Sequence, residues 1–326
     1  MKNITVLAVL VIIIGASTAN ISVFCQNNSR ETEDYQQKIN SKTQNVKQYD
    51  FSFAAQYGFV YGQASELVYK GNINNDLLSE LLWDMKPVHY LGVQLDYNSK
   101  DLMSSPGFFA STSFKAGLPG DSGIMEDRDW INSSFPTHFS SHTNRTDDLF
   151  WIDIVLGASF PARQFYIKPF FSGSWMRFSF SGRDGNGIYP GSTVSFQGKE
   201  VIYYLQDWFL IGTGFSIGTK ILSPFSFDLS FQMSPFTFCS ATDEHLMTET
   251  TYRDLTAWGF YLEPGGNISV NMKYISFSFN LSYRFIGRTI GPSYRDKDNS
   301  GFFIQEGNAG AGLSLLDTRF LIKVHI

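Results

Sequence analysis

Apolar and polar residues alternate along most of the chain after about residue 50. The clearest case is 275–285, ISFSFNLSYRF, in which every second residue is apolar. The same alternation returns in 91–97, 152–160, 209–217, 225–234 and 320–326. Because the side chains of a β-strand point alternately to its two faces, each segment predicts a strand with one apolar and one polar face.

Two architectures can use such strands. In a soluble sandwich the apolar faces form a dry core, whereas in a membrane barrel they contact lipid and the polar faces line the interior. Three features favour the barrel. The apolar faces are rich in the chain's 31 Phe residues, the strands reach the roughly 9–11 residues needed to span a bilayer, and short links such as 222–224 and 273–274 alternate with long polar stretches. We therefore expect an all-β fold, a ten-stranded antiparallel transmembrane β-barrel with long extracellular loops.

The alternation and its interruptions give approximate bounds for ten strands. The longest loops, 119–147, 183–199 and 288–306, are expected at one rim together with 70–76 and 242–250, and chemistry on external substrates belongs at that rim. The expected strands are 50–69, 77–97, 107–118, 148–160, 164–182, 200–220, 225–241, 251–271, 275–290 and 307–326.

The first residues predict export from the cytoplasm. Lys2 is followed by an apolar run and by the small residues 15–19, the pattern of a secretory signal peptide at 1–19, with cleavage as late as residue 25. Cys25 leaves a lipidated N-terminus open, although the preceding Phe24 is large for that signal. Residues 20–48 are polar and predict a flexible leader, with a partner-binding arm as the alternative. The barrel is expected over 49–326.

Composition excludes several classes of protein. Charged residues make up 17% of the chain and the net charge is −5, which argues against a disordered chain and against a basic nucleic-acid-binding domain. Two cysteines cannot form a disulfide scaffold or a Cys-based zinc site.

Two polar pairs stand near the ends of predicted strands. Asp127 and Asp129, and likewise Asp243 and His245, have the spacing i, i+2, which places both side chains of a pair on one face about 7 Å apart. A carboxylate beside an imidazole orients it, so His245 is expected to be a general base and Asp243 its orienting partner. The two neighbouring aspartates are expected to share a proton, position a water molecule and stabilise a developing oxyanion.

Simpler interpretations of these residues stay open. Asp127 and Asp129 can form a solvated acidic loop or bind a divalent cation, and Asp243 with His245 can form a surface pair. The remaining histidines are expected to be structural or solvated: His89 and His325 within strands, and His138 and His142 in a polar loop. Cys239 is expected to be an inert buried thiol on a strand.

These motifs together resemble the omptin family of outer-membrane proteases, over about residue 50 to the C-terminus. The D-x-D-W pattern matches 127–130 and is followed by the pair 133–134, SS. The D-E-H pattern matches 243–245 and is followed by 251–253, TYR. The resemblance implies an aspartic-type endopeptidase that activates water between Asp127 and His245, in the outer membrane of a diderm bacterium, with its active site on the extracellular side.

The resemblance also implies a substrate class. It suggests cleavage next to basic residues, so cationic peptides or proteins are the expected substrates, and it implies that Glu66 in 65–69, SELVY, holds the basic side chain. Ala241 stands where the family often has a second acidic residue, and the surroundings of Ser141 lack another. Both departures suggest a weaker or altered preference. No cofactor is implied, a requirement for lipopolysaccharide or another lipid activator is open, and a monomer contacting outer-membrane lipid without nucleic acid is expected.

Two other functions compete with proteolysis. The departure at Ala241 motivates a catalytically inactive barrel that acts as a surface adhesin or binding protein. A small channel is the third possibility, but the interior of a ten-stranded barrel is expected to be largely filled by side chains.

Overall fold

The structure of the protein is a computed structural model that describes residues 50–70, 76–99, 105–222, 224–297, 300–301 and 303–326. The predicted signal peptide (1–19), the leader (20–48) and Cys25 lie outside these residues and stay predictions. No helix in the described part of the chain is long and apolar enough to cross a membrane.

The described residues form fourteen antiparallel strands of one sheet. Three pairs of consecutive strands, β3 with β4, β10 with β11 and β12 with β13, each make one interrupted pass along the sheet, and β7 is a short addition to β6. The strands are β1 (Asp50–Tyr69), β2 (Leu77–Asn98), β3 (Gly107–Gly117), β4 (Gly120–Asp129), β5 (His138–Ala162), β6 (Phe165–Tyr189), β7 (Ser192–Ser195), β8 (Glu200–Leu222), β9 (Phe225–His245), β10 (Thr250–Ala257), β11 (Tyr261–Asn271), β12 (Ile275–Ile286), β13 (Gly291–Lys297) and β14 (Ile304–His325).

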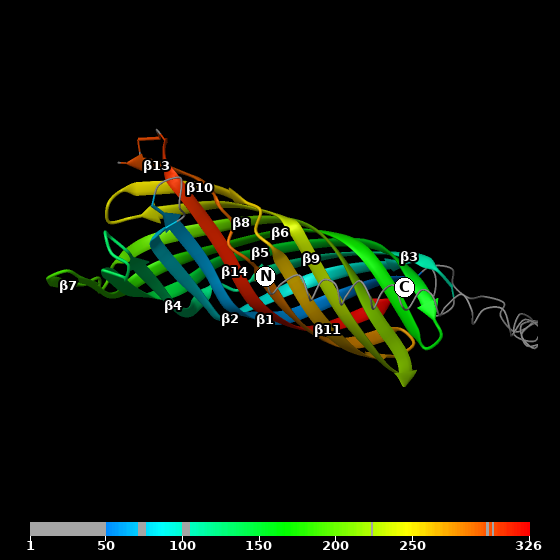
Figure 1. Ribbon diagram of the computed structural model, residues 1–326. Coiled ribbons are helices and arrows are strands. Elements are labelled where there is room, and N and C mark those ends of the chain that lie inside the picture. The colour runs from blue at the N-terminus through cyan, green and yellow to red at the C-terminus, as the bar shows by residue number, and fades with distance from the viewer. Residues whose placement is uncertain (1–49, 71–75, 100–104, 223, 298–299, 302) are drawn as a thin grey trace, which may run out of the picture. The chain divides into compact units, whose positions relative to one another are not determined.

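The sheet closes on itself, because β1 pairs with β2 on one side and with β14 on the other. Ten passes therefore surround one lumen, and the predicted ten-stranded antiparallel barrel is confirmed (Figure 1). We call the end at which β1 begins the lower rim and the opposite end the upper rim. β13, β10 and β7 lie at the upper rim, on the left of Figure 1.

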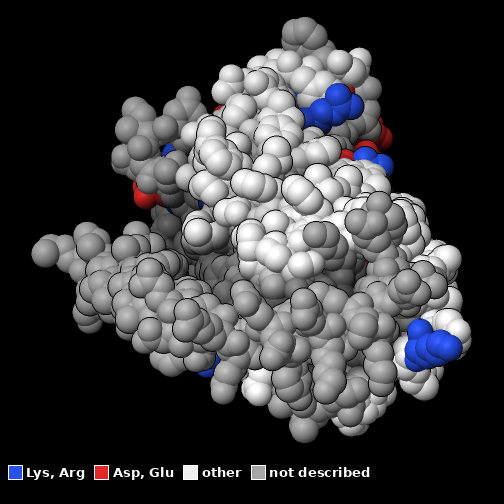
Figure 2. All heavy atoms as spheres, turned by 90° about the vertical axis from the view of Figure 1, so that its right-hand side faces the viewer, with Lys and Arg blue, Asp and Glu red and all other residues white. Residues whose placement is uncertain are grey.

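An apolar band surrounds the lower part of the barrel. Alternate residues of β12, including Phe277, Leu281 and Phe285, are 40–44% exposed, while Ser276 and Arg284 between them are buried in the lumen. The band is the outward face that the alternation predicted for contact with lipid. Figure 2 looks onto the lower rim and shows few charged side chains among the described residues of that view.

The strands continue above the band, where the sequence predicted loops. Most of 119–147 forms β4 and the first part of β5, so the prediction that His138 and His142 lie in a loop is wrong. β13 lies inside 288–306, and β6 and β7 extend into 183–199. Backbone groups here still pair across the ladder. Outward side chains above the apolar band need not be apolar, as is expected outside the lipid-facing band of a membrane barrel, and the alternation is lost there.

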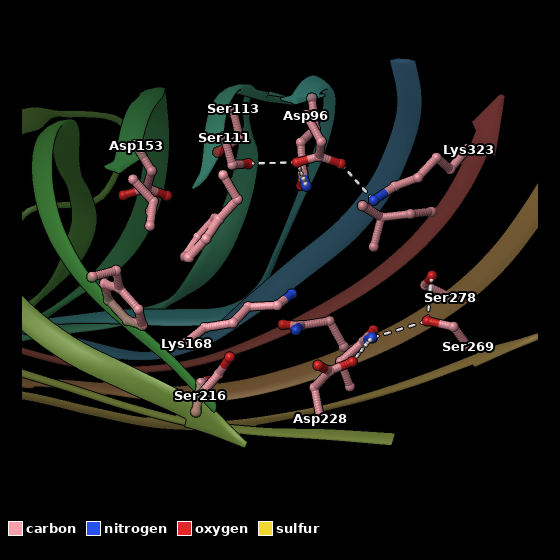
Figure 3. Close-up of a pocket in the computed structure, with 18 of the residues that line it drawn as sticks. Asp96, Ser111, Ser113, Asp153, Lys168, Ser216, Asp228, Ser269, Ser278 and Lys323 are labelled. Atoms are coloured by element: carbon pink, nitrogen blue, oxygen red, sulfur yellow. Dashed lines mark hydrogen bonds and ion pairs between the residues drawn. The ribbon is translucent and has the colours of Figure 1, made fainter. Parts of the chain in front are cut away.

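Side chains fill the middle of the lumen. Trp83, Trp151 and Trp208 are fully buried there within one apolar cluster. Below this cluster lies a polar cavity of about 430 Å³. Figure 3 shows its wall, on which Asp96 accepts a hydrogen bond from Ser111 and pairs with Lys323. The buried tryptophans separate this cavity from the upper rim, so an open channel is not favoured.

Candidate active site at the upper rim

The first predicted pair ends β4 at the upper rim. Met125 is buried in the lumen, and Asp127 and Asp129 follow it at alternate positions, so they share its inward face. Asp127 accepts a hydrogen bond of 3.3 Å from the Ser79 hydroxyl of β2. Both carboxylates thus lie on the lumen side of the wall.

The second predicted pair ends β9 at the same rim. Cys239 and Ala241 are buried inward, and the alternation continues through Asp243 to His245. His245 Nε2 lies 2.6 Å from Asp243 Oδ2. A carboxylate accepts hydrogen bonds only, so Nε2 carries the proton and Nδ1 is the ring nitrogen left to accept another.

The two pairs affect each other electrostatically. Burial and the charge of Asp129 raise the pKa of Asp127 to about 7, while His245 acts in the opposite direction. Burial also raises the pKa of Asp129. Near neutral pH this pair of aspartates therefore holds a proton for part of the time.

His245 is held in its charged form. Burial disfavours the imidazolium, but the charge and hydrogen bond of Asp243, followed by the charges of Asp127 and Asp129, raise its pKa to about 9. The ring of Tyr252 on β10 meets the His245 ring edge-on, with 5.4 Å between ring centroids. The side chain remains 38% exposed and open to the lumen mouth.

Glu66, the residue expected to bind substrate, is a buried lumen carboxylate. It is 2% exposed on β1, and its Oε2 has no hydrogen-bond partner. Burial and the charges of Asp243, Asp254 and Asp127 raise its pKa well above the usual range. Gln206 of β8 reaches across the lumen and donates a 3.0 Å hydrogen bond to the carbonyl of Ser65, which fixes the backbone beside Glu66.

An aromatic layer forms the floor of the site. The ring of Trp83 stacks on Tyr204 and on Phe180, with centroid separations of 5.4 and 5.6 Å. All three side chains are fully buried. This layer supports the carboxylates above it and keeps them in a less polar environment than water.

Sequence reasoning missed Ser79 and Asp254, and it noted Tyr252 only as part of the motif at 251–253. Asp254 of β10 is 3% exposed and pairs in the ladder with Ala241. Residues 246–249 between β9 and β10 form a four-residue connection that sets this pairing, so a hairpin alignment of 238–245 on 250–257 could have found Asp254. Nothing local in the sequence marks Ser79.

The described residues contain no group of three or more His, Cys, Asp or Glu side chains arranged to hold a metal ion. The alternative that Asp127 and Asp129 bind a divalent cation therefore gains no support from the arrangement of the side chains.

The sequence and the fold of this chain are similar to those of known outer-membrane proteins. The model of the omptin family matches residues 47–315. A plasminogen activator of Yersinia pestis is 24% identical over 285 residues, which cover 83% of this chain and 87% of that protein. The structure of the outer membrane protease OmpT from Escherichia coli superposes with a TM-score of 0.77 at 18% identity, covering 88% of this chain and 100% of the other.

Proposed function

The chain belongs to the omptin family and is therefore an outer-membrane protease, and we propose how it acts. The proposed activity is that of an endopeptidase that cleaves exposed polypeptides with an activated water molecule. The upper rim is proposed to face the exterior of the cell. The observation that carries the proposal is the Asp243–His245 hydrogen bond of 2.6 Å in the same lumen mouth as Asp127 and Asp129.

The proposed chemistry begins with water between Asp127 and His245. Neutral His245 accepts the water proton at Nδ1 while the oxygen attacks the amide carbon, and Asp243 stabilises the imidazolium that forms. The proton shared by Asp127 and Asp129 donates a hydrogen bond to the developing oxyanion. His245 then returns its proton to the leaving amine, and the carbon–nitrogen bond breaks.

The acidic lumen favours cationic substrates. Asp127, Asp129, Asp243 and Glu66 together create a negative potential that attracts basic peptides. A substrate cation also stabilises neutral His245 relative to its charged form, because two positive charges repel each other. Binding is therefore expected to lower the pKa of His245 from about 9 toward the value that a general base needs.

Cleavage of dibasic peptides by the refolded barrel tests this proposal. We expect wild-type protein to cut next to Arg or Lys, with products identified by mass spectrometry, in detergent with and without lipopolysaccharide. Asp127→Ala and His245→Ala are expected to lose at least about 10³-fold in kcat/KM. Equal rates for all three proteins would defeat the proposal, and binding of proteins without any cleavage would favour a surface adhesin.

A further inference from the structure

Two buried carboxylates below the pair of Asp243 and His245 each have an oxygen that accepts no hydrogen bond in the described structure. Glu66 and Asp254 are 2% and 3% exposed, and their atoms Oε2 and Oδ1 have no hydrogen-bond partner. Asp243 has a third such atom, Oδ1. An unpaired buried charge is strongly unfavourable, so this arrangement is stable only if protons or a cationic group compensate it.

The position of Asp254 follows from the hairpin register. Asp254 on β10 lies directly opposite Ala241 on β9, two residues before Asp243. Leu255 is 45% exposed on the outer face, whereas Asp254 and Thr256 are buried on the lumen face. β10 thus supplies the carboxylate of Asp254 at the level where β9 has only the methyl group of Ala241.

Glu66 and Asp254 belong to one electrostatic group. The charge of Asp254 is among the causes that raise the pKa of Glu66, and the pKa of Asp254 is itself raised to about 7 by burial and by Asp243, against a hydrogen bond with Ser293. The charges of Glu66 and Asp254 also contribute to raising the pKa of the buried Tyr204, after the larger effect of burial. These acidic groups come from β1, β9 and β10, so carboxylates from three strands of the lumen wall lie close enough to affect one another.

We infer that Asp254 is a specificity-determining residue that, with Glu66, binds the cationic side chain adjacent to the scissile bond. This inference rests on the proposed endopeptidase function and adds to it. The ligand class is a lysine or arginine side chain, whose charged end would form charge-assisted hydrogen bonds with both carboxylates. In this chain the methyl group of Ala241 therefore does not remove the second carboxylate, because β10 provides it.

Matched peptides with arginine or citrulline beside the cut test the inference, because citrulline keeps the shape and removes the charge. We expect wild-type protein to prefer arginine by about 100-fold or more in kcat/KM, and Asp254→Asn to reduce this ratio by at least about tenfold. The double variant Asp254→Asn with Ala241→Asp moves the carboxylate to the opposite strand and should restore most of the ratio. Asp121→Asn, at an exposed pair with Arg183, is the control that should keep the wild-type ratio.

The outcomes separate the two proposals. An unchanged ratio in Asp254→Asn, or an equal loss on both peptides without rescue by Ala241→Asp, overturns the role of Asp254. Failure of wild-type protein to cleave either peptide overturns the endopeptidase instead. The role of Asp254 can then still be tested by calorimetry with an arginine peptide whose scissile bond is reduced and cannot be cleaved. Asp254→Asn should weaken binding of this peptide at least about tenfold and leave the weaker binding of the citrulline peptide unchanged.

Discussion

Buried charges are paired in the lower half of the lumen, whereas in the upper half two buried carboxylates each have an oxygen without a partner. In the lower half Lys115 Nζ lies 2.9 Å from Asp317 Oδ2, and Arg284 Nη2 lies 2.6 Å from Glu263 Oε2. In the upper half Glu66 and Asp254 each keep an oxygen without a partner. Paired buried charges hold a structure in one arrangement, whereas unpaired ones leave binding energy for a ligand of opposite charge. The comparison predicts that breaking a charge pair below lowers stability, whereas removing an unpaired carboxylate above alters activity and raises stability.

The largest effect is expected from Asp243→Asn. The amide can bond His245 in the wrong tautomer, so kcat should fall by about 10³–10⁴-fold, as loss of the orienting carboxylate does in serine proteases. The unfolding midpoint in urea should change little, because the isosteric amide keeps its place in the wall. An activity within tenfold of wild type would show that His245 does not depend on Asp243.

In the lower half, Lys115→Met should act on stability. It removes the nearer cation from buried Asp317, which keeps a hydrogen bond from Tyr90 and the more distant Arg319 at 3.5 Å, so the loss should be about 3 kcal/mol, the lower end of the cost of breaking a buried pair. Activity per folded molecule should stay at the wild-type value. Arg183→Met is the control, because Arg183 and its partner Asp121 are 40% and 58% exposed and an exposed pair contributes below about 1 kcal/mol. Equal losses in the two variants would remove the contrast.

Asp254→Asn should change stability in the opposite direction. The pKa of Asp254 is raised to about 7 in the folded state, above its ordinary value of about 3.9 when unfolded, so the folded state binds the proton more tightly. Wild-type protein therefore loses stability as the pH rises from about 4 to 7. The variant lacks this penalty and should be more stable by up to about 4 kcal/mol at pH 8, with the difference shrinking toward pH 4. Urea unfolding at several pH values measures it, and a destabilised variant at pH 8 would contradict the assignment.

The smallest expected effect concerns the proton on His245. Its pKa of about 9 means that the imidazole becomes neutral only as the pH rises, whereas the pKa of about 7 for Asp127 means that the proton of the aspartate pair is then lost, so kcat/KM should follow a bell-shaped pH profile between these two values. Asp129→Asn removes a negative charge that favours the imidazolium, so the pKa should fall by less than about one unit. Nuclear magnetic resonance of labelled histidine, with His245→Ala to assign the signal, measures the shift. A rise in the pKa of His245 in Asp129→Asn would contradict the proposed effect of the Asp129 charge.

The sequence could predict the lipid-facing barrel because bilayer contact imposes an alternation that each strand records locally. Phe277 and Phe285 show it within one segment. The same reasoning placed Asp127 and His245 at one rim, since the number of passes fixes which strand ends meet. It failed above the band, where His142 lies on a strand without an apolar pattern. Asp254 was missed because its position depends on pairing with another strand.

Intact-protein mass spectrometry during peptide turnover tests the central chemical claim most directly. The account predicts that cleavage by the refolded barrel proceeds with the protein at its unmodified mass at all times, and that both fragments are released together without a burst. This activity should disappear in His245→Ala. An adduct of the protein with a peptide fragment at early times would contradict attack by water and would require a side-chain nucleophile instead.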